Sequence, residues 1–212
     1  MHLGLARFES YGDQYRLKTL ILIAPNSLLY KAFLEAFDHL PQVEVINNYF
    51  EWLTEFDCLV SPANSFGMMD GGMDAAITKY FGVSLEESVQ NRILEEYLGE
   101  QPIGTSLIVE THHPKHPYLA HTPTMRVPMV IKGTDIPYTA MWAMLLAVRK
   151  HNQQSPNSIE SVACPGLGTG IGRVPYAEAA RQMALAYDHF LYPPKFINCF
   201  VAASRQLQIW EG

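Results

Sequence analysis

Two kinds of hydrophobic pattern alternate along the chain. Short apolar runs typical of buried strands occur at residues 19–24, 43–46, 57–61, 106–109, 118–121 and 159–164, and a run at 196–202 predicts a last strand. Apolar residues at helical spacing predict helices that end before Pro41, cover about 73–81 and 84–98, start at Thr134 or Asp135, and cover about 174–190. This alternation predicts an α/β fold with helices on both faces of a mixed, mostly parallel sheet.

Length and composition favour one domain over residues 1–212, with a core at about 18–202 and short extensions at both ends. The chain has 212 residues, of which 48% are hydrophobic, enough for one sizeable core. The longest apolar stretch, Ala140 to Val148, is far shorter than the ~20 residues that cross a bilayer, and no signal peptide is visible. Three cysteines without a close pair indicate reduced thiols, so we expect a cytoplasmic protein without a membrane partner.

The charge balance argues against nucleic acid as a direct partner. The formal net charge is −6, and no run of lysine or arginine occurs, whereas a protein that grips a phosphate backbone needs a basic surface. A small anionic ligand remains possible, because main-chain amides at a helix N-terminus hold phosphate without basic side chains.

A glycine-rich segment, residues 165–173, follows one predicted strand and precedes a helix. Its glycines stand at every second position: Gly166, Gly168, Gly170 and Gly172. Glycine lets the backbone take unusual conformations and lets a ligand approach closely. The spacing differs from the dinucleotide fingerprint and from a Walker A loop. The segment serves either as a tight strand-to-helix turn or, as the number of glycines favours, as a cradle for a diphosphate.

A second glycine-containing segment, residues 61–77, lies after an earlier strand. Gly71 and Gly72 open a helix and would leave main-chain amides free. Asn64 follows the strand end, where its amide could bind a sugar hydroxyl or form a local turn. Asp74 stands in the first helical turn, where it either belongs to a ligand site or only complements the helix dipole. In α/β sheets, ligands bind beyond the carboxyl ends of strands, which is where both segments fall.

Two other chemistries are conceivable. His112, His113, His116 and His121 could suggest a zinc site, but a polar hairpin loop explains the proline-containing stretch better. Cys58 or Cys164 could act as a nucleophile with a histidine, although both lie in apolar strands, where an inert buried thiol is expected.

Taken together, the two segments resemble the macro domain family. Ser61-Pro62-Ala63-Asn64 resembles its strand-end motif, and Asp70-Gly71-Gly72-Met73-Asp74 its helix start. Residues 165–172 resemble its later Pro-x-x-Gly-Thr-Gly-x-x-Gly-like loop, and the strand ending at His121 also has a counterpart. The resemblance implies a three-layer α/β/α sandwich that binds ADP-ribose or a related nucleotide, without a cofactor or metal.

The resemblance also implies a role for each site residue. Asn64 with the amides around Gly71, Gly72 and Met73 would hold the distal ribose, and residues 168–172 would cradle the diphosphate. Glu51 would accept from the adenine amino group, and Phe50 or Trp52 would stack on the base or pack in the core. The ligand-binding set is Glu51, Ser61, Asn64, Gly71, Gly72, Met73, Gly168, Thr169, Gly170, Ile171, Gly172 and Arg173.

The family contains hydrolases and binding-only readers. Asn64 and Asp74 match, in type and separation, residues that matter for turnover in a branch that removes ADP-ribosyl groups or deacetylates O-acetyl-ADP-ribose. We therefore expect a hydrolase in which both residues are catalytic, and an ADP-ribosylated macromolecule as a possible partner; a reader or nucleotide sensor is the alternative. The chain departs from the family pattern at Ser61, Asp70, Thr78 and Arg173.

Overall fold

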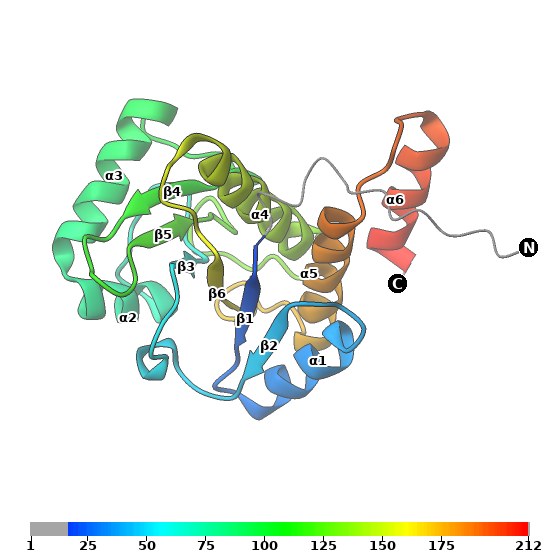
Figure 1. The fold of residues 1–212 in the computed structure, drawn as a ribbon, viewed down its shortest axis with the longest axis horizontal. Coiled ribbons are helices and arrows are strands. Elements are labelled where there is room, and N and C mark those ends of the chain that lie inside the picture. The colour runs from blue at the N-terminus through cyan, green and yellow to red at the C-terminus, as the bar shows by residue number, and fades with distance from the viewer. Residues whose placement is uncertain (1–16, 212) are drawn as a thin grey trace, which may run out of the picture.

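A six-stranded sheet forms the centre of the computed structural model, which describes residues 17–211 (Figure 1). The strands are β1 (Thr19–Ile23), β2 (Val43–Ile46), β3 (Cys58–Ser61), β4 (Leu107–Glu110), β5 (Tyr118–His121) and β6 (Ser161–Pro165). Their order is β2-β1-β6-β3-β5-β4, and only the β4–β5 pair is antiparallel. The prediction of a mixed, mostly parallel sheet is therefore confirmed.

Helices cover both faces of the sheet. They are α1 (Ser27–Phe37), α2 (Gly72–Phe81), α3 (Val83–Tyr97), α4 (Ile136–Gln154), α5 (Tyr176–Leu191) and α6 (Cys199–Glu211), with a short 3₁₀ helix η2 (Phe50–Trp52). Helices α1, α4 and α5 lie on one face of the sheet, and α2 and α3 lie on the other (Figure 1). The buried side chains form one core on each face. The result is the expected three-layer α/β/α arrangement.

Side chains along β1 point alternately to the two faces of the sheet, and this explains why the central strands are continuous apolar runs in the sequence. Leu20 and Leu22 belong to the core under α1, α4 and α5, whereas Ile21 and Ile23 belong to the core under α2 and α3. A strand with helices on both faces buries every side chain, so the period of two in hydrophobicity disappears. The same holds for β3, whose four residues are all buried.

Local signals in the sequence explain where α1 begins. The Asn26 side chain accepts hydrogen bonds from the amides of Leu28 (2.9 Å) and Leu29 (3.3 Å), as an N-cap residue does. At α4 the N-cap is Asp135, although its side chain makes no capping hydrogen bond. Helix α5 begins after Pro175, close to the predicted start.

The prediction of a last strand at residues 196–202 is wrong, because the chain forms helix α6 there instead. Short apolar runs do not distinguish a strand from a helix, and this run continues into a segment rich in good helix formers. Polar contacts anchor α6: Arg181 of α5 donates to the carbonyls of Gln208 and Ile209, and Arg205 lies over the Trp142 ring at 5.5 Å. The predicted extension of residues 1–16 lies outside the described residues.

Within residues 17–211, no helix combines the length and the apolar character that a membrane span would require.

Candidate functional site

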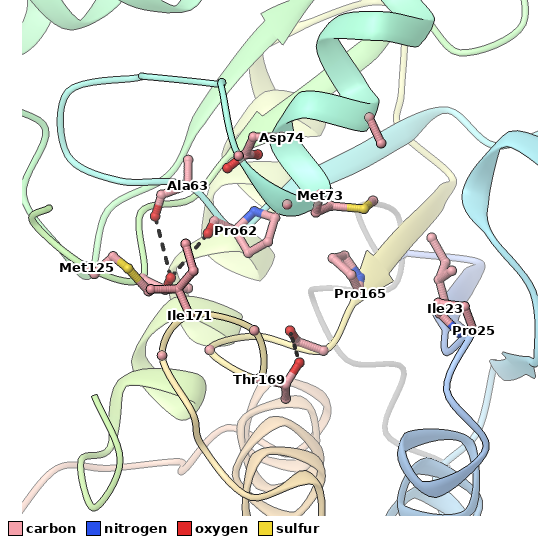
Figure 2. A pocket seen from close by; sticks show the side chains of 18 of the residues that line it. Ile23, Pro25, Pro62, Ala63, Met73, Asp74, Met125, Pro165, Thr169 and Ile171 are labelled. Atoms are coloured by element: carbon pink, nitrogen blue, oxygen red, sulfur yellow. Dashed lines mark hydrogen bonds between the residues drawn. The ribbon is translucent and has the colours of Figure 1, made fainter. Parts of the chain in front are cut away.

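A cavity of about 430 Å³ lies beyond the carboxyl ends of β1, β3 and β6. Because these three strands are parallel, the segments that follow them emerge at the same edge of the sheet. Residues after β1, β3 and β6 all line the cavity, together with the start of α2 (Figure 2). Its volume falls within the range of small-molecule sites, ~300–1,000 Å³.

The loop after β6 forms one wall of the cavity. Gly168 has a φ of +73°, and a Cβ on Gly172 would lie 2.5 Å from the carbonyl oxygen of Gly168, so both positions require glycine for the loop's own packing. Gly170 differs, because a Cβ there would meet nothing within 4 Å. Its surroundings are open space in the cavity, so glycine at this position serves close approach rather than the turn.

The amides of this loop are available to a ligand. Carbonyl groups of Gly168 and Gly170 accept from the amides of Val174 and Arg173, and the carbonyl of Gly172 accepts from Ile131. By contrast, the amides of residues 168–172 donate no hydrogen bond within residues 17–211. A loop that uses its carbonyls internally and leaves its amides unused is suited to an anion.

The start of α2 forms the facing wall. Gly71 is the N-cap of α2, and a Cβ on Gly71 or Gly72 would meet nothing within 4 Å. The first amides of a helix have no intrahelical partner and carry the positive end of the helix dipole. The structure thus places two sets of free amides around one cavity.

Asn64 lines the cavity, but its side chain is largely engaged in its own loop. Its Oδ1 accepts from the amides of Phe66 (3.1 Å) and Met68 (3.4 Å), and its Nδ2 donates to the carbonyl of Met68 (2.8 Å). An amide nitrogen carries two protons, so one N–H is left for a ligand. Of the two roles that the sequence allowed for Asn64, its hydrogen bonds show the local turn.

Asp74 lies at one end of the cavity and is only 8% exposed (Figure 2). Its Oδ1 accepts a 2.6 Å hydrogen bond from the hydroxyl of Ser61, which is fully buried at the end of β3. Burial raises the pKa of Asp74 to about 6; the Ser61 hydrogen bond opposes that rise, and the nearby carboxylates of Asp70 and Glu86 add to it. A carboxyl group with such a pKa can take up or release a proton near neutral pH.

The raised pKa predicts that Asp74 destabilises the fold at neutral pH. The folded pKa of about 6 lies above the ordinary 3.8, so the stabilising contribution of this group is full below pH 4 and is lost as the pH rises through 6. We expect Asp74→Asn to raise the free energy of unfolding by about 3 kcal/mol at pH 8, and by only about 0.5 kcal/mol near pH 4. Urea unfolding at both pH values measures this; a difference that does not change with pH would contradict it.

The opposite end of the cavity is formed by the segments after β1 and β2. Glu51 in η2 lines the cavity there, as does Tyr49, which is exposed. Phe50 also reaches the cavity but is buried, and its ring packs against Tyr80 with 5.4 Å between centroids. Trp52 is 74% exposed and does not line the cavity. At this end of the cavity, Tyr49 is thus an exposed aromatic side chain in the lining.

Most residues proposed from the sequence surround this cavity, and two do not. The lining includes Glu51, Asn64, Gly71, Gly72, Met73, Asp74, Gly168, Thr169, Gly170, Ile171 and Gly172. Ser61 lies behind Asp74 and touches the site only through it. Arg173 is exposed and is not part of the lining. Among the described lining residues there is no lysine or arginine, which leaves the amides as the groups that attract an anion.

Sequence reasoning missed several lining residues. They are Pro25, Asn26, Tyr49, Thr124, Met125, Pro128 and Tyr176. Asn26 could have been found, because it follows the end of β1 and the rule for carboxyl ends of strands applies to it equally. Tyr49 and Met125 stand in irregular segments without a motif, and only the folded chain brings them to the cavity.

The histidine and cysteine alternatives find no support in the described residues. His116 stacks on Phe56 at 3.7 Å in the loop between β4 and β5, and the Nδ1 of His121 bonds to Oε1 of Gln101 at 2.7 Å. Burial lowers the pKa of His121 to about 3, so this ring stays neutral. No three potential metal ligands come together within residues 17–211. Cys58 and Cys164 are fully buried, and burial raises the pKa of both thiols.

The chain is similar to proteins of one known family. The Macro domain family profile matches residues 60–183. An uncharacterized protein from Aquifex aeolicus is 32% identical over 73% of this chain and 87% of its own length. One from Aeropyrum pernix is 32% identical over 61% of this chain, and the match spans 62% of that protein. A variant of the Oceanobacillus iheyensis macrodomain, solved with ADPR, has a TM-score of 0.51 at 20% identity, covering 63% of this chain and 70% of that structure.

The matched region includes both glycine-containing walls of the cavity and more than half of the chain. The fold is similar to that of the Oceanobacillus iheyensis macrodomain structure, at the TM-score of 0.51. The chain therefore belongs to the macro domain family.

Proposed function

We propose that this protein binds ADP-ribose in the cavity and hydrolyses the bond between the distal ribose and an attached group. The observation that carries the proposal is the pair of amide-rich walls, at residues 168–172 and 71–73, with the buried carboxyl group of Asp74 beside them. The related Oceanobacillus iheyensis structure, solved with ADPR, supports the choice of ligand.

The proposed binding mode distributes the nucleotide along the cavity. The diphosphate would lie against the amides of residues 168–172, where Gly170 leaves room for it. The adenine would lie toward Tyr49 and Glu51, and the distal ribose toward Asn64 and the start of α2. Fixed main-chain dipoles then neutralise the diphosphate without a lysine or arginine.

Hydrolysis would use Asp74 as a general base. Its carboxylate would take a proton from a water that attacks the anomeric carbon of the distal ribose. The new C–O bond forms as the bond from that carbon to the acceptor breaks. The departing acceptor takes up a proton from solvent, and Asp74 returns to solvent the proton that it took from the water. The hydroxyl of Ser61 holds one carboxylate oxygen, which leaves the other to face the water. General-base catalysis of this kind is worth ~10²–10⁴-fold in rate.

A non-catalytic reader is the second candidate. The observation in its favour is the Asn64 side chain, which holds its own loop together and keeps only one N–H for the ribose or a water. If turnover requires more than one hydrogen bond from the Asn64 side chain, the cavity would bind ADP-ribose without cleaving it.

Calorimetric titration tests the binding proposal. We expect saturable one-to-one binding of ADP-ribose, and AMP, which lacks the diphosphate and the distal ribose, should bind at least ~10-fold more weakly, a difference of about 1.4 kcal/mol. NAD and a phosphorylated ADP-ribose serve as further comparisons. Absence of binding to ADP-ribose would reject the proposal. Release of ADP-ribose from a panel of ADP-ribosylated substrates then separates hydrolase from reader.

A further inference from the structure

Four consecutive apolar residues stand exposed at the mouth of the cavity. They are Val127, Pro128, Met129 and Val130, which we call the apolar rim. The exposed fractions of Val127, Met129 and Val130 are 45%, 48% and 52%. A run of this length costs solubility and favours aggregation, so proteins rarely keep one on the surface without a use for it.

Main-chain hydrogen bonds hold the chain in place on both sides of the rim. On its N-terminal side the carbonyls of Met125 and Arg126 accept from the amide of Ser65, and on its C-terminal side Ile131 donates to the carbonyl of Gly172. Met125 and Ile131 are both buried. These contacts tie the rim to both glycine-containing walls, so its side chains are presented beside the cavity rather than tucked into the core.

The rim adjoins the Asn64 side of the cavity, because Met125, two residues before the rim, forms a β-bridge with Asn64. Pro128 in the rim and Met125 just before it both line the cavity. Ile171, from the loop after β6, also lines the cavity and is apolar and exposed. In Figure 2, Met125, Ile171 and Asp74 are drawn toward the left of the cavity, away from Ile23 and Pro25. Under the proposed function, the group attached to the distal ribose leaves the cavity at this end.

Charge distinguishes a polypeptide from a nucleic acid at this surface. Arg126 is already engaged, because its Nη2 lies 2.9 Å from Oε2 of Glu100 and its guanidinium lies over the Phe66 ring. Lys132 is the other cation of residues 122–135, and the chain carries a net charge of −6. This surface has few free positive charges to bind a phosphate backbone, whereas apolar side chains of a polypeptide can pack against the rim.

We infer that the apolar rim is a docking surface for the acceptor polypeptide and selects modified sites whose neighbouring residues are apolar. This inference rests on the proposed function, since it requires that the cavity holds the ADP-ribosyl group. The rim would add affinity by burying apolar side chains next to the modified residue.

The test compares two ADP-ribosylated peptides that differ only in the flanks of the modified residue, one apolar and one of glycine and serine. Binding is measured by fluorescence anisotropy with the Asp74→Asn protein, so that the peptides are not consumed, and free ADP-ribose is titrated alongside. We expect the apolar-flanked peptide to bind at least 10-fold more tightly. The double variant Met129→Glu, Val130→Glu should remove that gain while changing the Kd of free ADP-ribose less than 2-fold.

Val83→Glu is the matched control, because Val83 is 69% exposed at the start of α3 and does not line the cavity. It should leave the gain intact. Equal binding of the two peptides would overturn the inference while leaving the proposed function standing. Three other results would also overturn it. Tighter binding of an ADP-ribosylated oligonucleotide would indicate a nucleic acid as the occupant of the rim. Weaker binding of free ADP-ribose by the rim variant would indicate that the rim covers the cavity, and loss of self-association in that variant would indicate a second copy of the chain. If free ADP-ribose does not bind at all, both proposals fail.

Discussion

Gly170→Glu is expected to weaken ADP-ribose binding at least ~100-fold, a loss of about 2.7 kcal/mol, without unfolding the protein. A Cβ at Gly170 meets nothing within 4 Å, and this position has no positive φ, so the loop accepts a side chain there. The added carboxylate would face the diphosphate in the proposed pose. Two like charges ~4 Å apart repel by ~4 kcal/mol at an effective dielectric constant of 20, which exceeds the expected loss.

Two variants of the same loop serve as controls. Gly170→Lys adds comparable bulk with the opposite charge and should retain more affinity than Gly170→Glu, which separates charge from size. Gly172→Ala should instead lower the melting temperature, because its Cβ would lie 2.5 Å from the Gly168 carbonyl oxygen. Calorimetry and thermal denaturation measure both effects. Unchanged ADP-ribose affinity in Gly170→Glu would remove this loop from the site.

Asp74→Asn is expected to lower the rate of ADP-ribose release ~10²–10⁴-fold while leaving the Kd of ADP-ribose within about 3-fold. The asparagine keeps the shape of the side chain and can still accept the Ser61 hydrogen bond, but it cannot take a proton from water. Single-turnover assays on an ADP-ribosylated protein measure the rate. Asp38→Asn, an exposed carboxyl at the end of α1, is the control and should behave as wild type.

The pH dependence of the same reaction identifies the group. A general base works when deprotonated, so the rate should rise with pH through about 6, the pKa of Asp74, and then level off. Ser61→Ala removes the hydrogen bond that lowers this pKa and should move the rise to higher pH. A profile that stays in place in Ser61→Ala, or an Asp74→Asn enzyme with full activity, would assign the base elsewhere.

The sequence predicted those parts of the molecule that depend on local patterns. Runs such as residues 19–24 and 159–164 read as buried strands because helices cover them on both sides. The two glycine-containing segments could be brought together by one rule, that carboxyl ends of parallel strands share an edge. Gly170 and Gly71 face open space in the cavity, as close approach of a ligand requires.

The remaining features depend on contacts that a local pattern does not contain. The run at 196–202 is equally apolar in a strand or a helix, and contacts with Arg181 and Trp142 accompany the helical outcome. Arg173 follows the loop in sequence, yet it is exposed and does not line the cavity. For Asn64 the sequence allowed either a local turn or a ligand contact, and the folded loop adds the hydrogen bonds with Phe66 and Met68.

The most direct test of the central claim follows the main-chain amides of both walls in one ¹⁵N NMR titration with ADP-ribose. The account predicts that the amide signals of residues 168–172 and of residues 71–73 shift along a single saturation curve, because both walls contact the same nucleotide. Shifts confined to one wall, or to neither, would contradict it.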